Sequence, residues 1–174
     1  MLQRVVLGLG SNVGNREIFL KSAVKKLSSR WNFLFISASS IYETEPWGFK
    51  YQNNYLNCIL VVLYRSGPGS LIREIREVEN NLGRINRGKW HPREIDIDIL
   101  FFGDKLINKK KLIVPHPLIR ERRFVLEPLN ELMPDFIHPV FHKKISKLFN
   151  KIPDKNASKL YKQQDFKWHK IKAH

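Results

Sequence analysis

Residues 94–107 read Glu-Ile-Asp-Ile-Asp-Ile-Leu-Phe-Phe-Gly-Asp-Lys-Leu-Ile, and this stretch does most to decide the fold. Residues Ile95 to Phe102 predict a strand, because polar and apolar residues alternate before the run becomes wholly apolar. Successive strand side chains point to opposite faces, so Asp96 and Asp98 share one face and the isoleucines between them enter the core. Gly103-Asp104 predicts a turn that returns Leu106-Ile107 as a hairpin partner.

Two further segments upstream have strong periodicity. Tyr55 to Tyr64 is a long apolar strand, and Leu71, Ile75, Val78 and Leu82 recur at helical spacing until Gly83 ends the helix. Nearer the N-terminus we expect a strand at Arg4–Leu9, a helix at Ile18–Leu27 capped by Asn15, and a strand-rich segment at Phe33–Tyr42. The order strand, helix, strand, strand, helix, strand favours an α/β (α+β), ferredoxin-like sheet, mainly antiparallel, with helices packed on it.

Length and composition predict one domain over residues 1–174. Beyond Pro115 the chain is irregular, with a short helix near Ser146 and a lysine-rich C-terminal extension from about residue 152. The sequence has neither an apolar stretch long enough to span a bilayer nor a recognisable export signal, and its single cysteine, Cys58, predicts a buried thiol. We therefore expect a monomeric cytoplasmic protein that binds neither membrane nor nucleic acid.

The formal net charge of +15 indicates either a polyanionic ligand or a well solvated lysine-rich surface. Charge alone does not distinguish nucleic acid, a membrane surface and a nucleotide. Many of the lysines lie in peripheral stretches such as Lys109-Lys-Lys and residues 142–172, for which solvation is a sufficient explanation.

The pair Asp96 and Asp98 is the first candidate site. Two carboxylates at this spacing repel each other unless a cation lies between them, and Mg2+ prefers such hard oxygen ligands. For an isolated pair, the solvated face of an antiparallel strand that binds nothing is the favoured interpretation. The neighbouring cations change that balance, because phosphoryl transfer requires positive charge around the transferring group; they are Arg84, Arg87, Lys89, Arg93, His116 and Arg122, with Trp90 among them.

A second constellation follows Thr44-Glu45-Pro46-Trp47-Gly48. Tyr55 and Phe124 could stack on a flat ring, and Asn57 offers both a donor and an acceptor to a heterocycle. Taken alone, each of the three is better explained as a structural residue. The glycines at 8, 10 and 14 do not match a dinucleotide-binding turn, which needs glycine where this chain has Val13. The chain also lacks a Walker A motif, so any bound ATP must be held by metal and side-chain cations.

The ordered motifs of the chain resemble the 6-hydroxymethyl-7,8-dihydropterin pyrophosphokinases of folate biosynthesis. They cover roughly residues 5 to 135 and read Gly10-Ser-Asn, Tyr42-Glu-Thr-Glu-Pro, Tyr55-Leu-Asn, Leu82-Gly-Arg, Trp90-His-Pro-Arg-Glu-Ile-Asp-Ile-Asp-Ile-Leu, Val114-Pro-His-Pro and Arg122-Arg-Phe-Val-Leu-Glu-Pro-Leu. The resemblance implies a ferredoxin-like fold and transfer of the β,γ-diphosphate of ATP to the pterin hydroxymethyl group, releasing AMP.

The resemblance also implies a role for individual residues. Asp96 and Asp98 bind two Mg2+ ions, Tyr55 and Phe124 sandwich the pterin, and Asn57 hydrogen-bonds to its ring edge. Thr44, Glu45 and Trp47 line the pterin pocket. The residues implied around ATP are Arg84, Trp90, Arg93, Lys111, His116 and Arg122; Arg84 and Arg93 act in catalysis with the two aspartates, and Glu79 contributes from further out.

The chain departs from the family pattern in the loop before the acidic pair. The usual Gly-Arg-x-Arg is here Gly83-Arg-Ile-Asn86, so Arg87 is a candidate replacement for the missing arginine, and Glu94 stands where a small residue or threonine is common. The rival function is a nucleic-acid-binding module, since RNA-recognition domains also use ferredoxin-like sheets and basic surfaces. Paired carboxylates on the strand that corresponds to the base-reading strand of such domains argue against it, because they repel phosphate unless a metal is bound.

Overall fold

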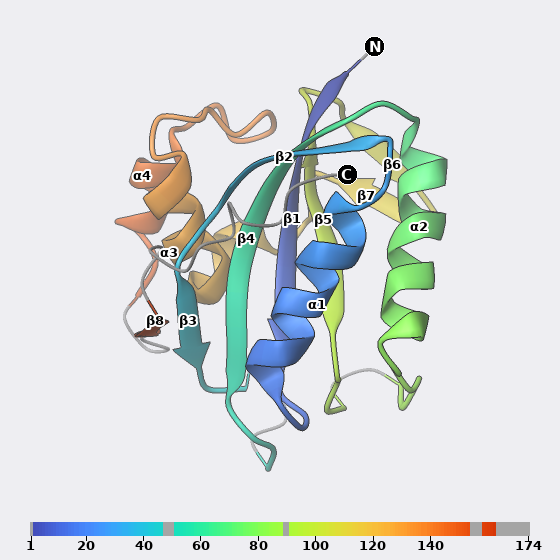
Figure 1. Cartoon of the computed structure of the whole chain (residues 1–174). Coiled ribbons are helices and arrows are strands. Elements are labelled where there is room, and N and C mark those ends of the chain that lie inside the picture. The colour runs from blue at the N-terminus through green and yellow to red at the C-terminus, as the bar shows by residue number, and fades with distance from the viewer. Residues whose placement is uncertain (1, 47–50, 89–90, 154–157, 163–174) are drawn as a thin grey trace.

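The central feature of the fold is a twisted antiparallel sheet with helices on both faces, seen in a computed structural model that describes residues 2–46, 51–88, 91–153 and 158–162 (Figure 1). The elements in chain order are β1 (Gln3–Ser11), α1 (Arg16–Ser28), β2 (Phe33–Ala38), β3 (Ile41–Thr44), β4 (Tyr55–Tyr64), α2 (Pro68–Asn81), β5 (Asp96–Phe102), β6 (Ile107–Lys109), β7 (Leu112–Val114), the 3-10 turn η1 (Ile119–Glu121), α3 (Arg123–Leu132), α4 (Ile145–Phe149) and β8 (Lys159–Lys162).

The strand order is β5-β1-β4-β3-β8, and β2 pairs with the far end of β4. The two neighbours of β1, which are β4 and β5, both run antiparallel to it. Since β2 and β3 together take the place of one long strand, the arrangement is the predicted ferredoxin-like order, and the α+β fold class is confirmed.

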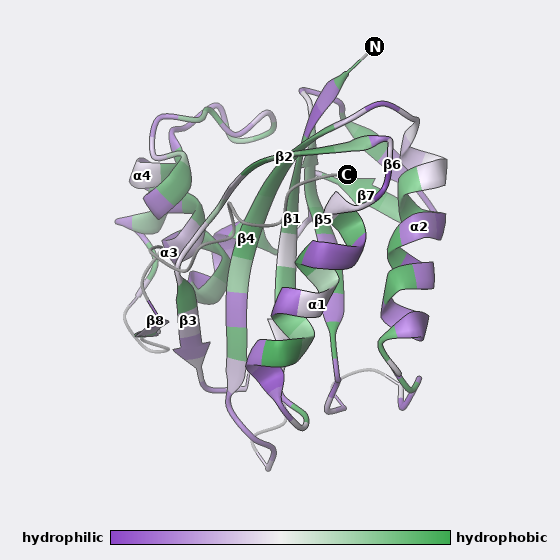
Figure 2. Ribbon diagram, in the orientation of Figure 1, coloured by the Kyte–Doolittle hydropathy of each residue, from purple (hydrophilic) through white to green (hydrophobic). Residues whose placement is uncertain are grey.

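One face of the sheet forms the larger core with α1 and α2. Alternate residues of β1 enter it at Val5, Leu7 and Leu9, and helix residues such as Leu20 and Leu71 pack against them with no exposed surface. Figure 2 shows hydrophobic residues along the strands and hydrophilic residues on the outer sides of both helices. This pattern follows from the period-2 and period-3.6 repeats of the sequence.

The opposite face is only partly covered. The turn η1 and helices α3 and α4 bury Val6, Ile59, Val61 and Phe101 in a second core cluster, at the end of the sheet near the start of β1. Further along β1 the same face carries Gly8 and Gly10, beside Asp98 and Asp96 of β5. This part of the face forms the floor of the cleft described below.

Several sequence predictions need correction. β5 does not form a hairpin with the segment after Gly103; β6 instead pairs with β7 in a separate two-stranded sheet, because Lys110 and Lys111 supply the turn. Ile18 is exposed and Leu20 takes its place in the core. The segment after Pro115 is not mainly irregular, since α3 continues through Pro128 with its apolar side buried.

The C-terminal extension also contributes to the fold, because β8 pairs with β3 at the edge of the sheet. The short helix expected near Ser146 is confirmed as α4. Cys58 is buried, as predicted, and burial raises the pKa of its thiol to about 12. Within the described part of the chain, every helix is too short or too polar to cross a bilayer.

Candidate active site

The floor of the cleft is set by the register of three neighbouring strands. Asp96 of β5 lies opposite Gly10 of β1, which in turn lies opposite Asn57 of β4. Two residues further along β5, Asp98 lies opposite Gly8. Neighbouring strands are about 4.8 Å apart, so the two glycines leave a low, flat strip roughly 10 Å wide between the carboxylates and the Asn57 amide. The glycines themselves add no side chain to this strip; Leu100 borders the space above Gly8, and Asn57 and Tyr55 border the space above Gly10.

Aromatic and polar side chains surround this strip. The described lining includes Thr44, Glu45, Tyr55, Asn57, Arg122 and Phe124 together with Arg93 and both aspartates. Asn57 is buried and donates from Nδ2 to Thr44 Oγ1 at 2.7 Å, which fixes the direction of its amide. Burial also raises the pKa of Tyr55, so its ring remains neutral at physiological pH. The predicted pterin-pocket residues in the described ranges therefore lie in one cavity.

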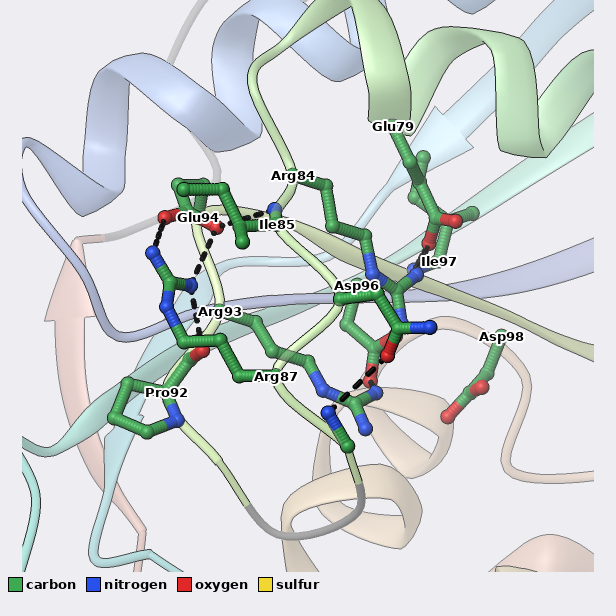
Figure 3. Close-up of polar contacts among 12 residues, drawn as sticks. Glu79, Arg84, Ile85, Arg87, Pro92, Arg93, Glu94, Asp96, Ile97 and Asp98 are labelled. Atoms are coloured by element: carbon green, nitrogen blue, oxygen red, sulfur yellow. Dashed lines mark hydrogen bonds and ion pairs between the residues drawn. The ribbon is translucent and has the colours of Figure 1, made fainter.

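The two aspartates are surrounded by arginines. Asp96 Oδ2 accepts from Arg93 Nη1 at 2.6 Å, and Asp96 Oδ1 pairs with Arg84 Nη2 at 2.9 Å (Figure 3). Arg122 Nη1 lies 3.5 Å from Asp98 Oδ2. Desolvation and the neighbouring Asp96 charge raise the pKa of Asp98 to about 6. Additional positive charge beside Asp98 therefore favours its ionised form.

The pair can hold a hard divalent cation. Both carboxylates face the same cleft and together supply two anionic oxygen groups, the number that Mg2+ commonly takes from protein when phosphates and water complete its shell. In the part of the chain that the structure describes, no group of three or more His, Cys, Asp or Glu side chains could hold a metal by itself. The remaining ligands would have to come from substrate and water.

Glu79 is connected to Asp96 through Arg84, which pairs with both carboxylates. Its carboxylate is buried, accepts from the backbone N–H of Ile97 at 2.8 Å and pairs with Arg84. Burial raises the pKa of Glu79 to about 7 even though Arg84 opposes the shift. Arg84 thus connects the C-terminal end of α2 to Asp96 on β5.

A second cavity adjoins the first across the aspartates. It is lined by Arg84, Arg93, Lys111, His116 and apolar residues that include Ile72 and Leu112. Burial and the Arg122 charge lower the pKa of His116 to about 4, and its Nδ1 accepts from the Leu118 N–H at 3.2 Å. The neutral ring therefore has its Nε2–H available as a donor.

The structure thus brings the predicted residues into two adjoining cavities that share Arg93, Asp96 and Asp98. Three predicted residues, Trp47, Lys89 and Trp90, lie outside the described residues. Sequence reasoning missed the part played by Gly8 and Gly10, which depends on strand register and has no signal in local sequence.

The loop before the acidic pair contains the residues at which the chain departs from the family pattern. Arg87 is not among the lining residues of either cavity; its guanidinium makes a two-pronged pair with Glu94, at 2.6 Å from Nη2 to Oε1 and 3.1 Å from Nη1 to Oε2. Asn86 caps the same turn by accepting from the Gly88 N–H at 3.1 Å. Arg87, which follows the departure at Asn86, and Glu94, the second departure, are therefore partners.

Fold and site together define a ferredoxin-like class of phosphotransfer protein, in which a carboxylate pair surrounded by arginines joins an aromatic pocket to a second, basic cavity. A family model described as 7,8-dihydro-6-hydroxymethylpterin-pyrophosphokinase (HPPK) matches residues 6–134. The chain belongs to this family.

Named relatives agree with this assignment. A 2-amino-4-hydroxy-6-hydroxymethyldihydropteridine pyrophosphokinase of Aquifex aeolicus is 45% identical over 142 residues, covering 81% of this chain and 87% of the relative. The Bacillus subtilis protein of the same name is 41% identical over 126 residues, covering 72% and 75% respectively. The folic acid synthesis protein fol1 of Pneumocystis carinii is 38% identical across 98% of this chain, which spans only 24% of that longer protein.

Solved structures support the fold. The Plasmodium falciparum HPPK-DHPS structure with STZ-DHP matches with a TM-score of 0.70 over 87% of this chain and 41% of that one, at 22% sequence identity. Identity at this level supports the architecture alone. The family assignment supports an enzyme and not the nucleic-acid-binding alternative.

Proposed function

We propose that this chain transfers the β,γ-diphosphate of ATP to the hydroxymethyl group of 6-hydroxymethyl-7,8-dihydropterin and releases AMP, as a step of folate biosynthesis. The observation that carries the proposal is the shared position of Asp96 and Asp98 between an aromatic pocket and a basic cavity. The names of the relatives supply the substrate and the pyrophosphoryl group.

The pterin occupies the aromatic pocket. Its ring lies over the Gly8–Gly10 strip, between Tyr55 and Phe124, and its polar edge faces Asn57 and Thr44. Because Thr44 fixes the Asn57 amide through a buried hydrogen bond, the amide presents an ordered polar edge without ordering cost on binding.

ATP occupies the basic cavity. Arg84 and Arg93, which line this cavity with Lys111 and His116, contact the phosphates. Arg122 reaches the phosphates from the aromatic pocket, beside Asp98. The ion pairs of these three guanidiniums with Asp96 and Asp98 support this assignment, because positive charge beside the metal ligands would stabilise the charge that develops during transfer.

Two Mg2+ ions, when bound by Asp96 and Asp98, would supply charge neutralisation and in-line alignment of the triphosphate with the pterin hydroxyl. In the transfer itself, the pterin hydroxyl oxygen forms a bond to the β-phosphorus, the bond from that phosphorus to the α,β-bridging oxygen breaks, and the hydroxyl proton passes to solvent. Arg84, Arg93 and Arg122 stabilise the charge that develops as AMP leaves. No covalent intermediate with the protein is required.

Two predictions about the cellular state remain proposals. The single buried thiol supports a reducing compartment such as the cytoplasm, and the position of the cleft within one chain supports a monomer.

The direct test is to incubate the protein with ATP, Mg2+ and the reduced pterin and to separate the nucleotides by ion-exchange chromatography. AMP should appear in equal amount with the pterin diphosphate, and only when pterin is present. ADP as the product would show monophosphoryl transfer, and AMP without pterin would show simple hydrolysis; either result contradicts the proposal.

A further inference from the structure

The Glu94 carboxylate is the centre of a hydrogen-bonded cluster in the loop before β5. Glu94 has only 8% of its surface exposed, yet it accepts from both terminal nitrogens of Arg87 and from the backbone N–H of Ile85 at 3.3 Å. Arg87 Nη1 also donates to the Pro92 carbonyl at 3.1 Å (Figure 3). The side chains of Arg87 and Glu94 thus connect residues 85, 87, 92 and 94 of the loop.

The positions that they connect adjoin the two arginines on Asp96. Ile85 follows Arg84, whose Nη2 lies 2.9 Å from Asp96 Oδ1, and Pro92 precedes Arg93, whose Nη1 lies 2.6 Å from Asp96 Oδ2. The backbone of Arg93 is itself fixed to the end of β1, because its N–H donates to Asn12 Oδ1 at 2.8 Å. The Arg87–Glu94 pair connects the backbone next to Arg93, through Pro92, with the backbone next to Arg84, through Ile85.

We propose that Arg87 and Glu94 form a positioning pair that holds Arg84 and Arg93 on either side of Asp96 before the triphosphate arrives. The inference rests on the proposed function, and it assigns a shared role to Glu94, a departure from the family pattern, and to Arg87, which follows the departure at Asn86. Neither residue contacts the reacting atoms; both act through the backbone of their neighbours.

The geometry suits this role. A two-pronged arginine–carboxylate pair fixes orientation as well as distance, and the buried carboxylate leaves little room for alternative partners. The pair therefore fixes the backbone at Ile85 and Pro92 before substrate binds, which lowers the entropic cost of placing the adjacent arginines.

The test measures binding of a non-hydrolysable ATP analogue with Mg2+ by calorimetry to Glu94→Gln, Arg87→Met and the double variant. Each single variant should weaken binding on the order of tenfold, since two arginine side chains must then be ordered during binding. The double variant should bind no more weakly than the weaker single variant, because the residues act as one unit. Arg87→Lys should restore part of the loss, and pterin affinity should not change.

Arg73→Met is the matched control, because it removes one positive charge from the exposed side of α2, outside both cavities of the site. Wild-type nucleotide affinity in Glu94→Gln and Arg87→Met, or a loss of the same size in Arg73→Met, would overturn the inference. So would additive losses in the double variant.

Amide hydrogen exchange at Ile85 separates this inference from the proposed function, since it requires no nucleotide. Arg87→Met should exchange faster at Ile85 than wild type, although Arg87 does not itself bond to that amide, because Glu94 loses the partner that orients it. Unchanged exchange in a protein that still forms AMP would refute the positioning pair alone. Failure of the wild-type protein to form AMP would refute the proposed function, whatever the exchange rates are.

Discussion

Gly10→Ala tests the pterin pocket through a single added methyl group. A Cβ at residue 10 would lie 3.0 Å from Asn57 Oδ1 and 3.6 Å from Tyr55 Cδ1. The first distance is a few tenths of an ångström too short for a relaxed carbon–oxygen contact. The Asn57 amide must therefore retreat or rotate, although its Nδ2 is bonded to Thr44 Oγ1 at 2.7 Å.

The expected loss is that of about one hydrogen bond to the pterin. A typical hydrogen bond contributes about 1 kcal/mol, which corresponds to a roughly five-fold weaker pterin affinity. The free energy of unfolding should fall by a similar amount, about 1 kcal/mol, if the Asn57–Thr44 bond is strained as well. Affinity for the ATP analogue should not change, because Gly10 does not line the basic cavity.

Fluorescence titration with the pterin measures the effect, and a double-mutant cycle with Asn57→Ala identifies its route. If Gly10 acts through Asn57, adding Gly10→Ala to Asn57→Ala should cause little further loss. Wild-type pterin affinity in a folded Gly10→Ala protein would refute the reasoning. An equal loss with and without Asn57 would show that the methyl group obstructs the ring directly.

Three further predictions concern other parts of the molecule. Burial raises the pKa of Glu79 from 4.5 to about 7, so the folded state binds this proton more tightly than the unfolded state does. The free energy of unfolding should therefore fall by about 3 kcal/mol as pH rises through this interval. Urea unfolding from pH 4 to 8 should show a smaller fall in Glu79→Gln than in wild type, and equal falls in the two proteins would contradict this. Phe124→Ala should weaken pterin binding about tenfold through loss of stacking, with nucleotide binding retained; equal loss of both ligands would point to misfolding instead. Gly69→Ala, in α2 with no atom within 4 Å of the added Cβ, should raise the free energy of unfolding by about 0.5–1 kcal/mol; a lower value would refute the helix assignment there.

The sequence predicted those elements whose periodicity is strong and whose ends are marked. The strand Tyr55–Tyr64 was correct at both ends, and Gly83, with a φ of +81°, follows α2 as expected. Helix α3 was missed because Pro128 suggests a break, although Val125 and Leu129 show the one-turn spacing of a buried helical face. The hairpin was assigned to the wrong partner because β6 and β7 have only three residues each, too few to show a period.

The candidate site was predictable where chemistry depends on residue type and strand alternation. Asp96 and Asp98 share a face because β5 is extended, and the resemblance to a known family supplied the aromatic and basic partners. The position of Gly10 beside Asn57 depends on the register between β1 and β4, which local sequence does not encode. The pairing of Arg87 with Glu94 likewise depends on the path of the loop between them.

The most direct measurement of the central claim is a calorimetric titration of a non-hydrolysable ATP analogue, with Mg2+ or with EDTA, into wild type and into the Asp96→Asn, Asp98→Asn double variant. The account predicts that Mg2+ strongly tightens binding to wild type and has little effect on the variant, whose amides lack the anionic oxygens that the ion requires. A double variant that is folded and retains the full Mg2+ dependence would contradict it.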